Sequence, residues 1–347
     1  RDFFMPNDAG AVRTFASALV GVDAQLIDVE VDQRPGLTNM TVVGLPDKAC
    51  GEARERIKSA LRNCGQKLPQ CHVVFNLAPA ELPKSGSGFD LAMAIGLLLR
   101  RGEADESVTR VTLFLGELAL DGKLRPVSGV LAAAQMAKLA GFSDIVLPHE
   151  NAGEASLVEG LAVRPASHFR EVIQHCAGLR HLELAAPREP ALAQALHQVD
   201  LADIRGHAHA KRALEISAAG GHNLLFSGPP GSGKSMLAKG LVSILPPLDE
   251  AEMIEVTKIH SAAGLLSCNQ PYVPSRPWRN PHHSASAVSL VGGGSVPKPG
   301  EISLAHRGVL FLDELPEFGR EVLDHLRQPL ETGSVVVSRQ RQTVEFT

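Results

Sequence analysis

A glycine-rich loop between an apolar run and a helix-forming run constrains this chain more than any other stretch. Residues 224–226 have the composition of a buried parallel strand, and residues 236–245 favour a helix. Between them lies the pattern G-x-x-x-x-G-K-S, from Gly228 to Ser235, in the order strand, loop and helix that a P-loop requires. Glycines allow backbone N–H groups to approach phosphate oxygens, and the helix N-terminus adds partial positive charge. The stretch therefore predicts a nucleoside triphosphate site rather than a plain glycine-rich turn.

The P-loop residues have distinct expected roles. The Lys234 ammonium is expected to reach the β- and γ-phosphates, and the Ser235 hydroxyl is expected to be a ligand of Mg²⁺. The cofactors that this motif predicts are therefore ATP and Mg²⁺. The residues expected to bind the nucleotide are Gly228, Pro229, Pro230, Gly231, Ser232, Gly233, Lys234, Ser235 and Met236.

An acidic pair follows a second apolar run. Asp313 and Glu314 come directly after the apolar residues 309–312, about 80 residues beyond the P-loop. Open α/β sheets bind their ligands at the carboxyl ends of central strands, so we expect the pair beside the phosphates. We assign Asp313 to Mg²⁺ and Glu314 to the general base, with Lys234 as the second catalytic residue. Without a P-loop, such a run would more often be a strand that ends at the surface.

The composition is that of an ordinary soluble globular protein. The 347 residues are 44% hydrophobic and 21% charged, and no apolar run approaches the roughly 20 residues of a membrane span. The N-terminus has no signal-peptide pattern, and the five cysteines are scattered without a C-x-x-C pair. We therefore expect a cytoplasmic protein with reduced thiols and no membrane partner. The net charge of −4 argues against a bulk electrostatic grip on DNA but leaves room for a local basic surface.

Alternating strand and helix patterns predict two α/β domains. The first is expected at residues 11–180 and the second at 200–347, and residues 181–199 turn to alanine, proline and charge, as linkers do. Strands are expected at 26–31, 40–43, 72–76, 111–115, 118–124, 144–147, 224–226 and 309–312, and helices at 47–64, 89–99, 129–140, 168–178, 207–220, 236–245 and 250–259.

A glycine- and proline-rich stretch at residues 276–306 is interpreted as a mobile loop or hairpin that projects from the nucleotide-binding core. Its adjacent histidines, His282 and His283, raise structural zinc as an alternative. Consecutive side chains of an extended chain point in opposite directions, however, which disfavours a shared ion. Arg276 and Arg279 are expected to be free to contact phosphate, on nucleotide or on nucleic acid. The candidates for contacts of basic loops with nucleic acid are Arg276, Arg279, Lys298 and Arg307, and the alternative for each is ordinary solvated charge.

Part of the first domain resembles the proteolytic domain of Lon proteases. The similar segments are residues 83–88, 116–127 and 141–148, within a resemblance that spans 83–178. That family uses a Ser–Lys dyad, but here Gly88 stands at the position of the nucleophile, and Val130 or Leu131 at that of the lysine. The resemblance therefore implies a Lon-protease-like α+β domain without the catalytic dyad, and argues against an ATP-dependent protease.

The whole chain resembles the magnesium-chelatase-like AAA+ ATPases, in the ComM (YifB) family. The resemblance rests on residues 37–59, on residues 206–223, on the P-loop, on residues 276–283 and on residues 299–318. It implies a P-loop AAA+ core with a doubly wound parallel sheet, a homo-oligomeric hexameric ring, and action on single-stranded or branched DNA. Members of that family are DNA helicases that drive branch migration when incoming DNA is integrated during natural transformation.

Two further functions remain open alongside this one. The chain could be the motor subunit of a metal-chelatase complex, or a nucleotide-gated assembly scaffold without translocation. Family members continue beyond a segment like 335–347, so we expect a C-terminally truncated chain that lacks lid and sensor residues and hydrolyses ATP poorly. The arginine that completes a neighbouring subunit's site is left open among Arg320, Arg327 and Arg339.

Overall fold

The computed structural model describes residues 10–186, 199–293, 298–333, 335–339 and 342–346. The chain forms two compact units, residues 1–188 with 264–271, and residues 189–263 with 272–347. The division falls within the expected linker, most of which (187–198) lies outside the described residues. None of the described helices combines the length and the apolar character that crossing a bilayer requires.

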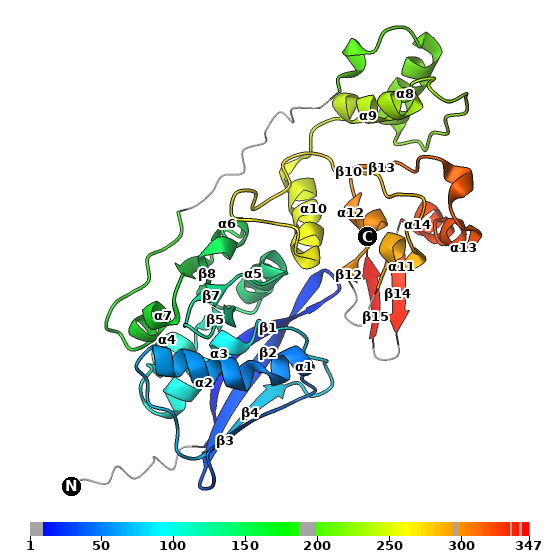
Figure 1. Ribbon diagram of the computed structural model, residues 1–347. Coiled ribbons are helices and arrows are strands. Elements are labelled where there is room, and N and C mark those ends of the chain that lie inside the picture. The colour runs from blue at the N-terminus through cyan, green and yellow to red at the C-terminus, as the bar shows by residue number, and fades with distance from the viewer. Residues whose placement is uncertain (1–9, 187–198, 294–297, 334, 340–341, 347) are drawn as a thin grey trace, which may run out of the picture. The chain divides into compact units, whose positions relative to one another are not determined.

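A seven-stranded sheet in the order β3-β4-β2-β1-β5-β8-β9 organises the first unit (Figure 1). The pairs β1–β2 and β2–β4 are antiparallel, and the other neighbours are parallel. This large, mostly parallel sheet confirms the expected mixed α/β class. The strands are β1 (Val12–Val20), β2 (Asp23–Arg34), β3 (Asn39–Val43), β4 (His72–Ala78), β5 (Thr112–Phe114), β8 (Asp144–Pro148) and β9 (Ala162–Ala166).

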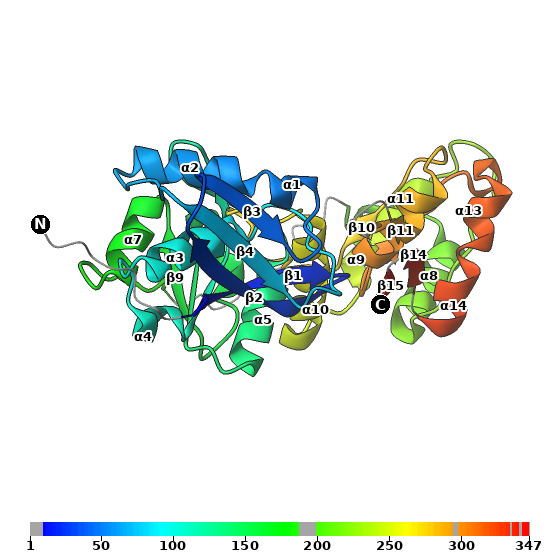
Figure 2. The same cartoon turned by 90° about the horizontal axis from the view of Figure 1, so that it is seen from below.

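Helices cover both faces of this sheet, as Figure 2 shows for α2 and α5. Successive residues of a strand point to opposite faces. Phe114 of β5 packs into the core of one face, whereas its neighbours Leu113 and Leu115 pack into the core of the other. Apolar residues of α2 (Ala53–Asn63), α3 (Asp90–Arg100) and α7 (Phe169–Cys176) belong to the first core, and those of α5 (Val130–Leu139) and α6 (Ala152–Ala155) to the second.

Helix α3 is buried on all sides, as its nearly continuous apolar sequence predicts. It approaches β1 and β2 closely at Gly96, where a Cβ would lie 2.6 Å from Val31 Cγ2. The Thr14 hydroxyl donates a 2.9 Å hydrogen bond to the Ala92 carbonyl at the same contact. The first residue of α3, Asp90, is fully buried and pairs with Arg56 of α2. Helix α3 thus connects strands β1 and β2 to helix α2.

Short elements complete the first unit and differ in detail from the expected ranges. The expected helix at 47–64 is divided into α1 (Lys48–Gly51) and α2, whereas the extended chain expected at 118–124 around a turn at Asp121 and Gly122 is present as a short hairpin. Strand β9 was not expected because it contains Pro165, which a strand at the edge of a sheet tolerates. The remaining elements are α4 (Glu106–Thr109), β6 (Glu117–Leu118), β7 (Leu124–Arg125) and η1 (His149–Asn151).

The second unit is mainly helical in its first half and has short strands in its second. The expected helices are present as α8 (Ala208–Gly220), α9 (Lys234–Ile244) and α10 (Glu250–Ala263), and a hairpin at the end of the unit pairs β14 (Val335–Arg339) with β15 (Gln342–Phe346). The other elements are η2 (Leu201–Asp203), β10 (Trp278–Arg279), α11 (Ala287–Val291), β11 (Gly292–Gly293), β12 (Lys298–Pro299), α12 (Glu301–Leu304), β13 (Val309–Leu310), η3 (Leu315–Glu317), α13 (Arg320–Asp324) and α14 (Arg327–Thr332).

The expected strand at residues 224–226 is not formed. Leu225 is 78% exposed, and Phe226 instead packs against the small core formed by Leu201, Ile204, Leu214 and Leu237. A strand exists only where neighbouring backbone takes up its N–H and C=O groups. Strand β13 finds that partner in β10, with Trp278 beside Val309. The described residues of the second unit therefore contain two-stranded pairs in place of the expected doubly wound parallel sheet.

Candidate nucleotide-binding site

The P-loop is shaped by two glycines in the left-handed region. Gly231 has φ of +75° and Gly233 has φ of +82°, a conformation that side chains rarely adopt. Gly233 is the N-cap of α9, and its carbonyl accepts the first helical hydrogen bond from the Leu237 N–H at 2.9 Å. The loop therefore leads directly into the helix N-terminus, where backbone N–H groups without helical partners are available to an anion.

The Lys234 side chain folds back across the loop. Its Nζ donates hydrogen bonds to the carbonyl oxygens of Gly228, at 2.9 Å, and Pro229, at 3.0 Å. These carbonyls hold the ammonium against the start of the loop. A phosphate group placed there would offer the same ammonium charged acceptors, which bind it more strongly than neutral carbonyls do.

The P-loop and the acidic pair meet through one hydrogen bond. Ser235 Oγ donates to Asp313 Oδ2 at 2.9 Å, although the two residues are 78 positions apart. The structure thus confirms that the acidic pair lies beside the P-loop. A hydroxyl and a carboxylate are hard oxygen donors, and Mg²⁺ at phosphate sites uses one or two such protein ligands. The pair therefore fits the expected metal by the chemistry of its donors.

Glu314 adopts a constrained conformation next to Asp313. Its φ is +54°, and its N–H donates to Asp313 Oδ1 at 3.1 Å. Its side chain is 66% exposed, and its Oε2 lies 3.4 Å from Nδ1 of His283. Positive φ in a residue other than glycine is uncommon and is often found at functional sites. The contact with His283 was not expected, because the sequence gives no sign of which carboxylate this histidine faces.

The zinc alternative finds no support at the two histidines. The rings of His282 and His283 lie 4.0 Å apart, centroid to centroid, and His282 Nδ1 accepts a hydrogen bond from the Ser284 N–H. In the part of the chain that the structure describes, no three histidine, cysteine or acidic side chains are grouped as a metal site would need.

Three of the four basic candidates for phosphate contacts are engaged in ion pairs, so the expectation that Arg276 and Arg279 stand free is wrong. Arg279 makes a two-pronged contact with Glu301, at 2.6 and 2.7 Å, which raises the pKa of the guanidinium. The stretch 276–306 is accordingly anchored in the second unit by β10 and the buried Leu290, rather than projecting freely as a whole. The arginines are not free because each one pairs with a carboxylate that is near it in space but distant in sequence.

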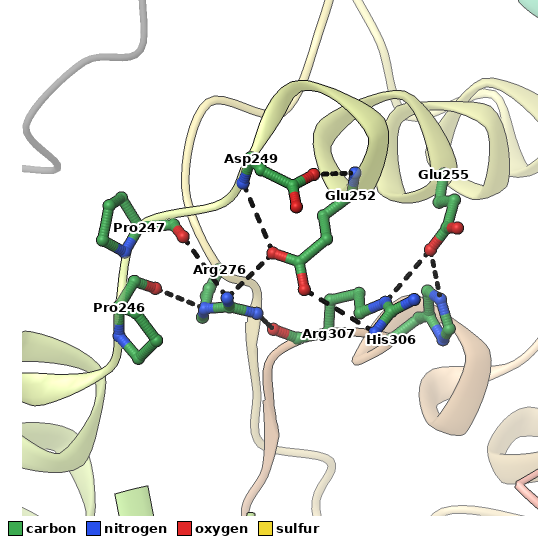
Figure 3. A network of polar contacts seen from close by, with 8 residues as sticks. All are labelled: Pro246, Pro247, Asp249, Glu252, Glu255, Arg276, His306 and Arg307. Atoms are coloured by element: carbon green, nitrogen blue, oxygen red, sulfur yellow. Dashed lines mark hydrogen bonds and ion pairs between the residues drawn. The ribbon is translucent and has the colours of Figure 1, made fainter. Parts of the chain in front are cut away.

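Arg276 and Arg307 belong to one polar network (Figure 3). Arg276 contacts Glu252 at 2.9 Å, and its side chain is only 14% exposed. Arg307 contacts Glu255 at 3.0 Å and Glu252 at 3.6 Å. The hydrogen bond from Arg307 lowers the pKa of Glu255 and raises that of Arg307 itself. The fourth candidate, Lys298, lies exposed on β12, with no ion pair to another described residue.

Two of the three candidate trans-acting arginines can be located. Arg320 is 96% exposed on α13, and Arg327 is 78% exposed on α14. Both face Asp324, at 4.0 and 3.8 Å. The Arg339 side chain lies outside the described residues. Exposure leaves Arg320 and Arg327 available to another subunit, and geometry does not separate them.

The Lon-like loop of the first unit contains no Ser–Lys pair among its described contacts. Ser87 Oγ donates to Glu117, and the fully buried Lys84 donates to the Pro79 carbonyl. Burial lowers the pKa of Lys84. At the position of the nucleophile, a Cβ on Gly88 would meet nothing closer than Val127 Cγ1, at 3.9 Å. The positions expected for a catalytic lysine hold Val130 and Leu131, both fully buried in the core.

Family models match both units. A model described as magnesium chelatase, subunit ChlI, matches residues 200–347. A second model, described as subunit ChlI of Mg-chelatase, matches residues 29–151.

Individual relatives cover almost the whole chain. The competence protein ComM of Haemophilus influenzae is 46% identical over 335 residues, which are 96% of this chain and 65% of that protein. YifB of Escherichia coli K12 is 45% identical over 333 residues, 95% of this chain and 64% of that protein. The chain thus spans just under two thirds of the length of these relatives. Lon protease 1 of Bacillus subtilis is 26% identical over 181 residues, 49% of this chain and 23% of that protein.

Proposed function

This chain belongs to the magnesium-chelatase-like ATPase family, in the group of ComM and YifB, and on that premise we propose that it is the ATP-hydrolysing part of a DNA motor. The observation that carries the proposal is the hydrogen bond between Ser235 and Asp313. It joins a phosphate-binding loop to the acidic pair that a hydrolase of this type needs. Neither feature alone would distinguish hydrolysis from nucleotide binding.

Each residue of the site has a role in this proposal. Lys234 exchanges the carbonyls of Gly228 and Pro229 for phosphate oxygens, and the backbone N–H groups of the loop orient the triphosphate. Ser235 and Asp313 hold Mg²⁺, which, when bound, neutralises charge that develops on the phosphates. Glu314 leaves His283 and accepts a proton from the attacking water.

The relatives direct the proposal toward DNA. The Haemophilus relative is named a competence protein, and it matches this chain over both units. We therefore propose a helicase that migrates branches in single-stranded or branched DNA during recombination in natural transformation. A hexameric ring would supply the arginine in trans, from Arg320, Arg327 or Arg339. Lys298 is the basic candidate whose exposure suits a contact with DNA phosphates.

A metal-chelatase motor is the second candidate, because both family models are described by that enzyme. The match of the whole chain to ComM and YifB, including the Lon-like first unit, favours the DNA motor. A nucleotide-gated scaffold, the remaining candidate, would contain the same nucleotide-binding site as the DNA motor and the metal chelatase.

The rate of ATP hydrolysis by the complete natural protein tests these alternatives. It should be measured alone, with single-stranded DNA, with a four-way junction, and with a tetrapyrrole and Mg²⁺. Stimulation by DNA supports the motor. A rate that DNA leaves unchanged and that the tetrapyrrole raises would favour the chelatase, and a rate indifferent to both would favour the scaffold.

A further inference from the structure

Arg276 contacts the chain just after helix α9 and just before strand β13 (Figure 3). Along the chain, both contacts are remote from Ser235 and Asp313, the residues of the nucleotide site. Its Nε donates to the Pro246 carbonyl at 2.5 Å, and its Nη2 to the Pro247 carbonyl at 3.3 Å, just beyond the end of α9. Its Nη1 donates to the Arg307 carbonyl at 2.7 Å, just before β13 begins. One guanidinium therefore joins the end of the P-loop helix to the start of the strand that precedes the acidic pair.

The near ends of the same two elements are joined by the Ser235–Asp313 hydrogen bond. From Ser235 to Pro246 is about 16 Å along a helix at 1.5 Å per residue. From Arg307 to Asp313 is at most about 20 Å of extended chain at 3.3 Å per residue. The two paths have comparable lengths, so helix α9 and the segment from Arg307 to Asp313, which contains β13, are connected at both ends, by Ser235–Asp313 at one end and by Arg276 at the other.

The contacts of Arg276 are specific to arginine. Three carbonyls and the Glu252 carboxylate surround it, and its planar fork supplies donors in several fixed directions. The turn that it holds is constrained as well, because Arg307 has φ of +58°. Gly308 follows it so close to β10 that a Cβ would lie 2.1 Å from the Pro277 carbonyl oxygen. The start of β13 is therefore fixed by contacts that leave it little freedom.

We infer that Arg276 is a positioning residue for the Mg²⁺–nucleotide site, which it serves by fixing the far ends of α9 and β13. This inference rests on the proposed function. Arg276 touches neither Ser235 nor Asp313; it determines how far the hydroxyl and the carboxylate stand apart when they take up the metal. Small displacements of aligned groups reduce activity strongly, by up to about 100-fold for 1 Å. Arg276 thus acts through geometry rather than through DNA phosphates.

The experiment measures nucleotide binding with and without Mg²⁺, using a fluorescent ATP analogue and the complete natural protein. The quantity compared is the factor by which Mg²⁺ strengthens binding. Arg276→Gln is expected to reduce that factor about tenfold and to leave Mg²⁺-free binding within about twofold. Arg276→Lys keeps the charge but loses the fork, so it is expected to recover only part of the effect.

A matched pair of substitutions on α10 separates positioning from general stability. Both glutamates contact Arg307, but Glu252 also contacts Arg276, whereas Glu255, less than one turn further on, contacts His306 instead. Glu252→Gln is expected to reduce the Mg²⁺ factor several-fold, and Glu255→Gln to leave it unchanged. Thermal unfolding shows whether the Arg276 variants fold poorly. If they do, the comparison of Glu252→Gln with Glu255→Gln still tests the positioning role of Arg276.

The outcomes distinguish this inference from the proposed function. Equal Mg²⁺ factors in the wild type and in Arg276→Lys, or equal losses in Glu252→Gln and Glu255→Gln, would overturn the positioning role alone. A wild-type protein whose nucleotide binding Mg²⁺ does not strengthen would contradict the proposed function, on which the inference depends.

Discussion

Ser235 and Asp313 share a 2.9 Å hydrogen bond across 78 residues of sequence. This contact places the first residues of α9 beside the chain that follows β13. Both residues offer oxygen donors suited to Mg²⁺, and Lys234, the first residue of α9, precedes Ser235 and reaches back to the Gly228 carbonyl. The predictions below follow from that arrangement and from the packing of the first unit.

Lys234→Ala should abolish tight nucleotide binding. Its ammonium is held over the loop by two carbonyls, and no other lysine of α9 reaches them in the described contacts. We expect kcat/KM for ATP to fall at least about 100-fold, because a charge aimed at the phosphates is lost. The control is Lys239→Ala, on the exposed side of the same helix, which should stay within about twofold. Similar losses in both variants would contradict the assignment.

Glu314→Gln should separate binding from hydrolysis. The amide keeps the shape of the side chain but cannot accept a proton, so kcat should fall about 100- to 1,000-fold while ATP binding persists. The matched control is Glu317→Gln, an exposed carboxylate three residues further on. Steady-state hydrolysis and equilibrium binding measured on both variants test this. Wild-type turnover in Glu314→Gln would remove the general base from the account.

Gly88→Ser should fold but should not hydrolyse peptides. The position has room for a side chain, since the nearest atom to an added Cβ is Val127 Cγ1 at 3.9 Å. Unfolding stability should change by less than about 1 kcal/mol. The positions expected for an activating lysine hold Val130 and Leu131, so the new hydroxyl lacks the base that a Ser–Lys dyad provides. Cleavage of a casein-type substrate by this variant would show that the Lon-like site retains a base that the geometry does not reveal.

The buried Asp90 should make the first unit more stable in mild acid. Burial raises its pKa to about 6, despite hydrogen bonds from Arg56 at 2.6 and 2.9 Å. An aspartate in the unfolded chain has a pKa of about 3.9, so its contribution to stability is full below about pH 4 and is lost as the pH rises through about 6, a change of roughly 3 kcal/mol. Asp90→Asn should remove this part of the pH dependence.

Urea unfolding of the wild type and of Asp90→Asn between about pH 4 and about pH 7 measures that difference. The stability of the wild type relative to Asp90→Asn should fall as the pH rises through this range. Parallel pH profiles would show that Asp90 has an ordinary pKa in the folded protein.

Much of the first unit could be predicted because its local patterns agree with its packing. The apolar helix at 89–99 is the buried α3, and the alternation at residues 26–31 is the core of β2. Strand β9 was missed because Pro165 argues against a strand, and only its place at the sheet edge makes that proline acceptable. An edge position is a property of the assembled sheet and is invisible in a local window.

The nucleotide site was predictable as a set of residues but not as a set of contacts. The order of P-loop and acidic pair indicated the Ser235–Asp313 contact, because strand ends in α/β folds converge. The ion pairs of Arg276 were not predictable, since Glu252 is 24 residues away and the Pro246 carbonyl 30. A sequence shows that a side chain is charged, but the fold determines whether its partner is a carboxylate of the same chain or a phosphate.

The most direct test is ATP-dependent strand displacement by the complete natural protein on forked and four-way-junction DNA, with Lys234→Ala and Glu314→Gln measured in parallel. The account predicts displacement by the wild type with ATP and Mg²⁺, and none by either variant. If the wild type hydrolyses ATP while no strand moves and DNA leaves the rate unchanged, the DNA-motor proposal is contradicted.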